Sequence, residues 1–281
     1  MKSCLQQLNL ARICLTQSFA AIVFFAAANA ALAQAPVTLE FAIEPSYGPE
    51  QMKEVYQPFL SYLEKSTGYK FKLITFRNYN SYWQEMREKK GWDLTFDEAH
   101  FTDYRIERMK FEPLVRTLEP GTYVLASGND VGAGNTTALL AERITTMAAP
   151  SLGYALLLEY FPNPMQQPDI RTNAASWLDA VDAVFAEESR ATMVPASVAA
   201  AYPNLYEIVR SREFAGPAIS ASSKVAPEVK AKITEALLKM HEDQDAFAAL
   251  NELRISQFVK ASALEYQGSG KVLKNFYGYG L

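Results

Sequence analysis

The sequence predicts an α/β fold made of two α/β lobes, and three observations support it. Short apolar runs typical of strands alternate with helical patterns over residues 37–96, and again over about 123–208. No Gly- or Ser-rich linker separates these two units. Extended stretches at 117–123 and 208–217 carry Pro or Gly near a lobe edge, as expected where the chain crosses between lobes.

The N-terminal segment predicts export. Lys2 and Arg12 precede residues 13–30, which contain no charge, and the small residues Ala31-Leu32-Ala33 follow. This layout is typical of a secretory signal peptide, so we expect residues 1–33 to be removed and the protein to be periplasmic. A membrane anchor is the alternative, but the apolar run is short and lacks a basic stop-transfer flank.

Local signals define the first unit. Residues 37–43 alternate as a strand, and Pro49 begins a helix whose apolar residues recur at helical spacing until Gly68 ends it. A strand is expected at 71–76. The next helix has a predicted capping box, Ser81 with Gln84, and ends at Gly91, after which 93–96 forms a short strand.

The second unit and the C-terminal part continue the pattern. Strands are expected near 123–126, 143–148 and 191–195, with helices over 152–161 and 175–187. Pro227 is predicted at the first position of a later helix. We therefore predict one lobe from residues 34–118 and 214–281 and a second from 119–213. Ligands of open α/β sheets bind beyond the carboxyl ends of the strands, which places the site in the cleft between the lobes.

Charge and cysteine content exclude several functions. Without residues 1–33, the chain has 248 residues with 25 basic and 31 acidic side chains, a net charge of about −6, which gives no basis for binding nucleic acid. Cys4 and Cys14 both lie in the predicted signal peptide, so the remaining chain has no disulfide and no thiol. It also has no Gly-rich phosphate loop, HExxH or GxSxG motif, and we expect no cofactor, no metal and no enzyme activity.

Four stretches together resemble a known family. They are GWDLTFDEAHFTDYRIERMKFEPLVR, APSLGYALLLEYF, VRSREFAGPAISASSKVAPEVKAKITEALL and ALEYQGSGKVLKNFYGY. In this order they are similar to PhnD-type periplasmic binding proteins, which serve ABC importers of phosphate, phosphite and phosphonates. The resemblance implies a type II periplasmic-binding fold whose two lobes close over the ligand. It also implies a monomer that delivers its ligand to an inner-membrane transporter.

Three stretches depart from the family's ligand-binding pattern. Family members have a Gly-Pro-x-x-Tyr turn after the third strand, and this chain has Phe96-Asp97-Glu98-Ala99-His100. The family's Ser-Thr-Ser-Gly turn, which binds phosphonate oxygens, is matched only by Ser151-Leu152-Gly153, followed by Tyr154. Where the family commonly has acidic residues that hold an amino group, residues 192–196 read Thr-Met-Val-Pro-Ala.

These departures favour a change of ligand. Asp97 and Glu98 would repel an oxyanion, and each lost charge-assisted hydrogen bond costs roughly 1.5–3 kcal/mol. Apolar side chains in the cleft would instead suit an amphiphilic apolar molecule such as a sterol or another lipid, which is our main hypothesis. A bacterial sterol-carrier branch of the family is then the nearer relative. The alternative is an ordinary phosphate- or phosphonate-binding component of an ABC importer.

The predicted ligand-binding residues are Tyr47, Tyr79, Phe96, Asp97, Glu98, His100, Ser151, Leu152, Tyr154, Met193 and Pro195. Simpler roles exist for several of them. Asp97 and Glu98 suit the N-terminus of the helix that begins near residue 99, and Ser151 suits an N-cap. Two other functions stay open: an enzyme that uses Asp97, Glu98 and His100 as acid and base, and a sensor that reports a ligand to a membrane kinase.

Overall fold

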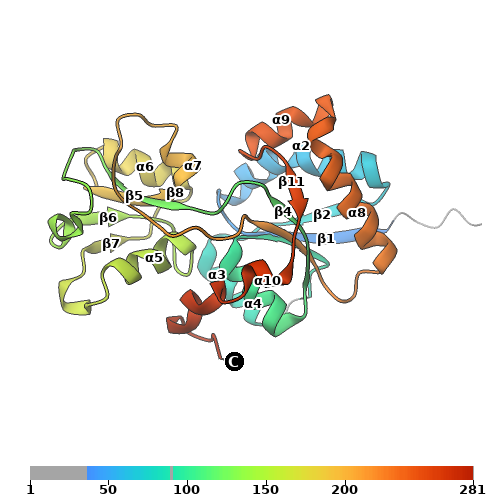
Figure 1. Ribbon diagram of the computed structural model, residues 1–281, viewed down its shortest axis with the longest axis horizontal. Coiled ribbons are helices and arrows are strands. Elements are labelled where there is room, and N and C mark those ends of the chain that lie inside the picture. Colours follow the sequence, from blue (N-terminus) through green and yellow to red (C-terminus); the bar gives the residue numbers. More distant parts are fainter. Residues whose placement is uncertain (1–36, 89–90, 281) are drawn as a thin grey trace, which may run out of the picture. The chain divides into compact units, whose positions relative to one another are not determined.

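Two β-sheets flanked by helices form the described part of the chain, residues 37–88 and 91–280 of a computed structural model (Figure 1). One sheet takes its strands from both ends of this part, and the other from its middle. The predicted two-lobed α/β fold is confirmed, while the lobe boundaries at 118/119 and 213/214 stay a prediction. The predicted signal peptide, residues 1–33, lies outside the described residues.

The first sheet is mixed. Its strands are β1 (Thr38–Ile43), β2 (Lys70–Ile74), β3 (Leu94–Asp97), β4 (Glu112–Thr117), β10 (Ala218–Ala221) and β11 (Phe258–Lys260), in the order β11-β4-β10-β3-β1-β2. Strand β1 pairs in parallel with β2 and β3, whereas β10 is antiparallel to β3 and β4. The parallel pairing puts the carboxyl ends of β1 and β3 at the same edge of the sheet, where ligands of α/β folds bind.

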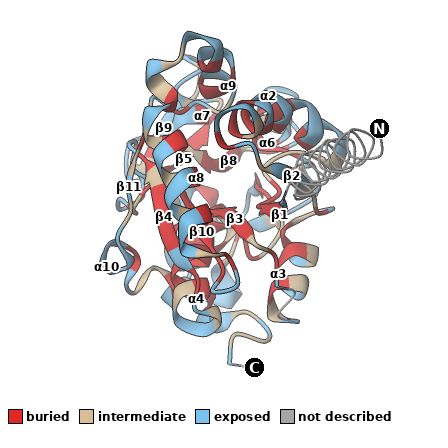
Figure 2. Cartoon of the chain, turned by 90° about the vertical axis from the view of Figure 1, so that its right-hand side faces the viewer, coloured by how far each residue is buried: buried red, intermediate tan, exposed pale blue. Residues whose placement is uncertain are grey.

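Helices cover this sheet and continue to the C-terminus. They are α2 (Pro49–Thr67), α3 (Tyr79–Arg87), α4 (Ala99–Met109), α8 (Pro227–Lys239), α9 (Phe247–Glu252) and α10 (Ala263–Tyr266), with the short 3-10 helices η3 (Met240–Glu242), η4 (Gln244–Ala246) and η5 (Ser269–Asn275). Figure 2 shows the exposed sides of α2 and α8 outside the mostly buried strands. As predicted, Pro49 begins α2, and Gly68 ends it in the left-handed region with φ 72°.

The second sheet has the order β7-β6-β8-β5-β9. Its strands are β5 (Tyr123–Ser127), β6 (Arg143–Thr145), β7 (Asp169–Arg171), β8 (Ala191–Pro195) and β9 (Tyr206–Arg210). The accompanying helices are η1 (Thr136–Leu139), α5 (Leu152–Tyr160), η2 (Pro164–Gln166), α6 (Trp177–Phe185) and α7 (Ala196–Ala199). Strand β6 and helix α6 are shorter than predicted, because the chain turns at 146–151 and Ser176 caps α6.

Helix α3 begins earlier than predicted. Its N-cap is Asn78, whose side chain accepts a hydrogen bond from Ser81 N–H at 3.0 Å, while Ser81 Oγ accepts one from Asn78 N–H at 3.2 Å. Ser81 is therefore the third helical residue of the capping box, and the predicted box of Ser81 with Gln84 is wrong. The physical reason is that Asn caps a helix as well as Ser does.

Two segments of the chain cross from one sheet to the other, and they lie side by side. The first runs from Thr117 to Tyr123, as predicted, and the second begins only after Arg210, because β9 extends to that residue. The crossings exchange hydrogen bonds at Gly121 and Phe214, with N···O distances of 3.0 and 2.9 Å. Nearby, Thr117 N–H donates to the carbonyl of Pro217 at 3.0 Å.

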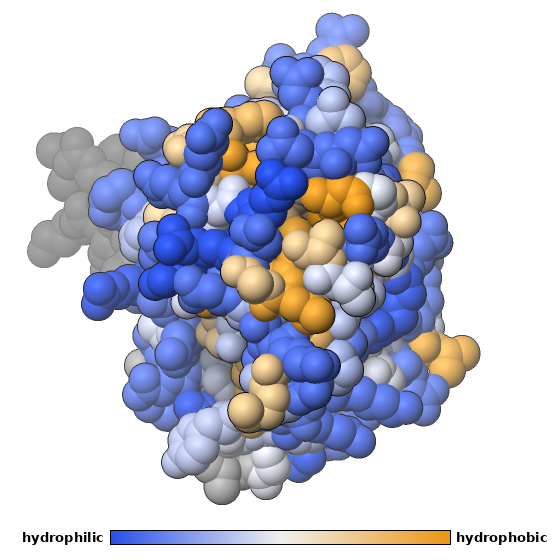
Figure 3. All heavy atoms as spheres, turned by 90° about the vertical axis from the view of Figure 1, so that its left-hand side faces the viewer, coloured by the Kyte–Doolittle hydropathy of each residue, from blue (hydrophilic) through white to orange (hydrophobic). Residues whose placement is uncertain are grey.

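Polar groups dominate the outer surface of the second-sheet region. Figure 3 shows that face as mainly hydrophilic, with apolar residues between the polar ones. Among the described residues, no helix is both long enough and apolar enough to cross a bilayer.

Gly216 permits the close approach of the two crossings. A Cβ atom there would lie 2.4 Å from Glu119 O, 2.4 Å from Thr117 Oγ1 and 2.6 Å from Thr117 O. We expect Gly216→Ala to lower the free energy of unfolding by about 1–3 kcal/mol, because two of these atoms are backbone and cannot rotate away. Urea unfolding followed by circular dichroism measures this.

Gly280→Ala is the matched control, because nothing lies within 4 Å of a Cβ atom at that position. It should unfold like the parent protein. If Gly216→Ala also unfolds like the parent, the crossings are not tightly packed against each other.

Candidate functional site

A cavity of about 200 Å³ lies between the two sheets, beside the crossings. It is enclosed by the carboxyl ends of β1 and β3, by both crossings, by the start of α6 and by the end of β8. Its lining includes Glu44, Ser46, Tyr47, Tyr56, Phe96, Glu98, Thr117, Glu119, Thr122, Tyr123, Trp177, Pro195, Ser197 and Arg254. The cavity thus lies where the fold predicts a ligand.

Three carboxyl groups face this cavity. Glu44 follows β1, Glu98 follows β3, and Glu119 lies on the first crossing. The first two are linked, because Glu98 N–H donates to Glu44 Oε2 at 2.9 Å. Glu119 Oε1 accepts a hydrogen bond from Ser256 N–H at 3.1 Å.

Glu98 forms a hydrogen bond across the cleft. Its Oε1 accepts the hydroxyl proton of Tyr123, at the start of β5, at 2.5 Å. Its Oε2 is buried and has no hydrogen-bond partner among the described residues. His100 Nδ1 lies 4.0 Å from this oxygen. One carboxylate oxygen is therefore bound by the second lobe, and the other is unpaired.

Burial keeps these carboxyls protonated to higher pH than usual. Burial raises the pKa of Glu98 to about 7, an effect that the hydrogen bond from Tyr123 opposes and the nearby charge of Asp97 adds to. Burial likewise raises the pKa of Glu44 well above its ordinary value, with further contributions from Glu98 and Asp97. Two neighbouring carboxyls in one dry site cannot both ionise without cost.

Aromatic rings line the cavity from both lobes. On the first-sheet side, the ring centroids of Tyr56 and Phe96 are 6.5 Å apart with an interplanar angle of 81°. On the second-sheet side, those of Tyr123 and Trp177 are 5.5 Å apart at 76°. Both are edge-to-face pairs, in which one ring presents its electron-rich face.

Asp97 does not line the cavity, in contrast to the prediction. It is fully buried and pairs with Arg105 of α4, whose Nε donates to Asp97 Oδ2 at 2.6 Å. The hydroxyl of Tyr82 also donates to Asp97 Oδ1 and accepts from Arg105 Nη2. The charge of Asp97 is compensated inside its own lobe, so the argument that it repels a ligand in the cleft is not supported.

The turn before α5, which matches the family's anion-binding turn only in part, has its hydroxyls occupied. Ser151 caps α5: its Oγ accepts from Tyr154 N–H and donates to Met147 O, both at 3.3 Å. Thr146 Oγ1 donates to Met193 O at 2.8 Å. His100 lies within hydrogen-bond distance of this turn, with Nε2 3.1 Å from Pro150 O.

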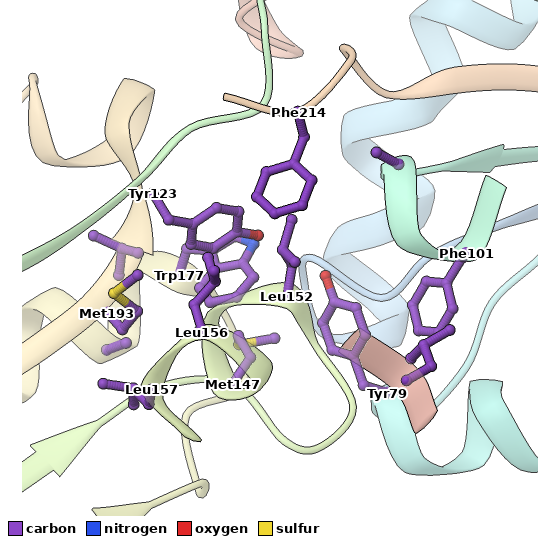
Figure 4. Close-up of a cluster of buried hydrophobic side chains, with 14 of the residues drawn as sticks. Tyr79, Phe101, Tyr123, Met147, Leu152, Leu156, Leu157, Trp177, Met193 and Phe214 are labelled. Atoms are coloured by element: carbon purple, nitrogen blue, oxygen red, sulfur yellow. The ribbon is translucent and has the colours of Figure 1, made fainter. Parts of the chain in front are cut away.

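Leu152 fills the space beside that turn. It is buried in a cluster drawn in Figure 4, together with Tyr79, Trp177 and Phe214. Met193 is buried in the same cluster. Leu152, Met193 and Tyr79 therefore act in packing and do not line the cavity, which removes much of the apolar wall on which the lipid hypothesis depended.

The remaining predicted residues divide between two places. Tyr47, Phe96, Glu98 and Pro195 line the cavity. Tyr154 is half-buried and lies against Phe276, with ring centroids 6.0 Å apart.

The cavity residues that were missed include Glu44, Glu119, Tyr123 and Trp177. Glu44 comes directly after a predicted strand, so the rule that ligands bind at carboxyl ends could have identified it. No local sequence pattern identifies the other three as cavity residues, because they come together only when the two lobes pack against each other. Within residues 37–88 and 91–280, no group of three or more His, Cys, Asp or Glu side chains is placed to hold a metal ion.

The buried pair of Asp97 and Arg105 gives a stability prediction. Asp97→Asn removes the negative partner and leaves the guanidinium buried, which should cost about 3–5 kcal/mol of unfolding free energy. Urea unfolding followed by tryptophan fluorescence measures the loss. Asp169→Asn is the control, because the pair of Asp169 with Arg171 is exposed and should leave the midpoint unchanged. Equal midpoints for both variants would contradict the assignment.

Glu98 gives a pH prediction. Its folded-state pKa of about 7 exceeds the ordinary 4.5, so the folded protein binds this proton more tightly than the unfolded chain. The stability that Glu98 contributes is thus present at acidic pH and lost as pH rises from 4.5 to about 7.

In Glu98→Gln this loss of stability should be smaller. The unfolding free energy should then fall less steeply as pH rises, and the remaining decrease should come from Glu44. Thermal unfolding between pH 4.5 and 8 measures it. Glu50→Gln, at an exposed site, should keep the parent slope. A parent-like slope in Glu98→Gln would show that Glu98 titrates normally.

One family profile matches most of this chain. A sequence profile described as "ABC transporter, phosphonate, periplasmic substrate-binding protein" matches residues 41–266. PhnD1 from Prochlorococcus marinus, solved in complex with methylphosphonate, has a TM-score of 0.72 and 14% identity, and the alignment covers 85% of this chain and 97% of that chain. No curated protein sequence matches this chain.

Two more solved structures are similar. A binding-protein component of an ABC phosphonate transporter from Pseudomonas aeruginosa has a TM-score of 0.67 and 17% identity, with 80% of this chain and 82% of that chain covered. XAC2383 from Xanthomonas citri, solved with ATP, has a TM-score of 0.65 and 13% identity, with 84% and 96% covered. At these identities the structures show the fold, which is of the type II periplasmic-binding kind.

The profile match spans most of the sequence, and the chain therefore belongs to the family of periplasmic substrate-binding proteins of phosphonate ABC transporters.

Proposed function

We propose that this chain is the periplasmic solute-binding component of an ABC importer and delivers a small ligand to an inner-membrane transporter. The family match over residues 41–266 carries the proposal. The predicted signal peptide at 1–33 agrees with a periplasmic location. In this role the protein acts as a monomer and catalyses no reaction.

The position of the cavity supports the proposal. It is enclosed by both lobes and by the two crossings, so a bound solute contacts every part that moves when lobes close about a hinge. Within this proposal, residues 34–118 and 214–281 form one rigid lobe and 119–213 the other. The enzyme alternative is weaker, because Asp97 is already neutralised by Arg105 and His100 is occupied at Pro150.

The ligand is a small solute. The cavity volume of about 200 Å³ lies below the roughly 300–1,000 Å³ typical of pockets for drug-sized ligands, so it does not favour a sterol or another lipid. A phosphate or phosphonate is better supported, because the family is named for phosphonates and PhnD1 was solved with methylphosphonate. Oxyanions are therefore the first solutes to test.

Trp177 offers a direct signal for binding. It lines the cavity, whereas Trp83 and Trp92 do not. A solute in the cavity should change the tryptophan emission, and this change should disappear in Trp177→Phe. Titration of a panel containing phosphate, phosphite, methylphosphonate, amino acids and organic amines measures it.

Trp83→Phe is the matched control and should keep the response, because Trp83 packs against Tyr104 away from the cavity. Saturable binding of any one solute at micromolar concentration supports a solute-binding protein. Absence of a response to the whole panel at millimolar concentration would contradict the proposal.

A further inference from the structure

We propose that Glu98 binds a phosphorus oxyanion in the cavity between the lobes by donating a hydrogen bond from its carboxyl oxygen Oε2. This inference rests on the proposed function, because it names a residue that selects the ligand of the same site. Its experiment separates failure of this hydrogen bond from failure of the solute-binding function.

The two oxygens of the Glu98 carboxyl group have different surroundings. Oε1 accepts the hydroxyl proton of Tyr123 at 2.5 Å. Oε2 is buried in a residue that is only 9% exposed and lines the cavity, and it has no hydrogen-bond partner among the described residues. A buried polar atom without a partner costs free energy, so Oε2 calls for a partner that enters through the cavity.

The hydrogen bond from Tyr123 determines where the carboxyl proton lies. Burial raises the pKa of the Tyr123 hydroxyl well above its ordinary value, so this hydroxyl keeps its proton and donates it to Oε1. Burial also raises the pKa of Glu98 to about 7, which makes the neutral carboxyl group abundant at neutral pH. Because Oε1 already accepts a proton, the proton of the neutral form is on Oε2. Glu98 therefore presents an O–H donor to the cavity.

His100 does not accept this hydrogen bond. Its Nε2 lies 3.1 Å from the carbonyl oxygen of Pro150, and since a carbonyl oxygen only accepts, the ring proton is on Nε2. Nδ1 therefore has a lone pair, but it lies 4.0 Å from Glu98 Oε2, which is beyond hydrogen-bond range. An oxyanion in the cavity supplies the acceptor that the protein does not.

Glu44 lies beside Glu98 and has a similar arrangement. Its Oε2 accepts the N–H of Glu98 at 2.9 Å, so the proton of its neutral form belongs on Oε1. Burial raises the pKa of Glu44 well above its ordinary value, and the nearby charges of Glu98 and Asp97 raise it further. Neutral carboxyl groups do not repel an anion. The two glutamates thus form a wall that donates protons to an oxyanion.

The rest of the lining also suits an anion. Ser46, Thr122 and Ser197 add polar side chains. Arg254 is the basic residue of the lining, and Glu119 is the remaining acidic one. The Arg254 side chain is exposed and donates to the carbonyl oxygen of Ser197 at 2.8 Å, which holds a positive charge where the cavity meets solvent. A positive charge in this position attracts anions toward the cavity.

Glu98 replaces donors that the turn before α5 does not offer. In that turn Ser151 Oγ donates to the carbonyl oxygen of Met147 at 3.3 Å, and Thr146 Oγ1 donates to that of Met193 at 2.8 Å. A hydroxyl group has a single proton, so neither side chain has one left for a ligand. The donor on Glu98 Oε2 has no such partner among the described residues.

Glu98 is surrounded by groups whose titration has to be considered. The titratable and charged groups around the pair of Glu98 and Glu44 are Tyr79 of α3, Asp97 at the end of β3, His100 and Arg105 of α4, and Tyr123 of β5. Burial raises the pKa of both tyrosines well above 10 and lowers that of His100 to about 3. These three groups therefore keep their protons unchanged between pH 6 and pH 8.

Calorimetric titration with methylphosphonate at pH 6 and pH 8 tests the proton on Glu98. With a pKa of about 7, the neutral fraction of free Glu98 falls about tenfold over this range, and the affinity should fall with it. A phosphonate also loses its second proton near neutral pH. Glu98→Gln measures that contribution, because an amide does not titrate.

We expect the affinity of the parent to fall about tenfold more than that of Glu98→Gln between pH 6 and pH 8. Equal changes in the two proteins would overturn donation by Glu98. Glu50→Gln, on an exposed face of α2, is the matched control and should keep the pH response of the parent.

Glu98→Ala separates the hydrogen bond from the charge. The carbonyl oxygen of Gln can accept from Tyr123, which turns its NH₂ group toward the position of Oε2, where it still donates. Ala has no donor. At pH 6 we expect Glu98→Gln to bind methylphosphonate within about threefold of the parent, and Glu98→Ala to bind it at least about tenfold more weakly. Circular dichroism checks that both variants fold. Equal affinity of the parent and a folded Glu98→Ala protein at pH 6 would overturn the assignment.

The outcomes separate the two proposals. Binding of methylphosphonate with the same affinity and pH response in the parent and both Glu98 variants overturns the role of Glu98 and leaves the solute-binding function intact. Binding of another solute of the fluorescence panel, without any response to phosphate, phosphite or methylphosphonate at millimolar concentration, has the same consequence. If no solute of the panel binds, both proposals fail.

Discussion

The burial of acidic side chains at the carboxyl ends of β1 and β3 is the constraint on which the site depends. Asp97 and Glu98 are neighbours in the chain, yet they are compensated differently. Asp97 pairs with Arg105 and Tyr82 within its own lobe, whereas Glu98 receives one hydrogen bond from Tyr123 in the other lobe. The first arrangement stabilises a lobe, and the second links the two lobes beside the cavity.

The elements that local sequence signals define were predictable. Pro49 begins α2 and Gly68 ends it. Both effects are local, because the rigid φ of proline starts a helix and the left-handed conformation of glycine ends one within a single turn. Competing local signals explain the errors, as with Asn78, which caps α3 where Ser81 was expected.

The order of strands in the first sheet could not be predicted from local signals. Strand β10 lies between β3 and β4 through pairing over more than a hundred residues, which no window of sequence contains.

The site was less predictable than the fold, for the same reason. The sequence marked Asp97 and Glu98 together, and only tertiary contacts decide that the first is neutralised by Arg105 while the second faces the cavity. Asp97 ends β3 and Glu98 follows it in an extended conformation, so the two side chains point in opposite directions. Which of the two faces the cavity depended on where α4 and β5 lie.

The turn before α5 shows what a partial motif match can mean. Ser151 and Gly153 are the residues that match the family's anion-binding pattern, but both have structural roles here. Ser151 caps α5, and a Cβ atom at Gly153 would lie 2.9 Å from Thr146 Oγ1 and 3.2 Å from Met193 O. Helix α5 can pack this closely on β8 only with glycine at that position. The matching residues thus follow from capping and packing, and the cavity between the lobes is lined by side chains that the motif does not include.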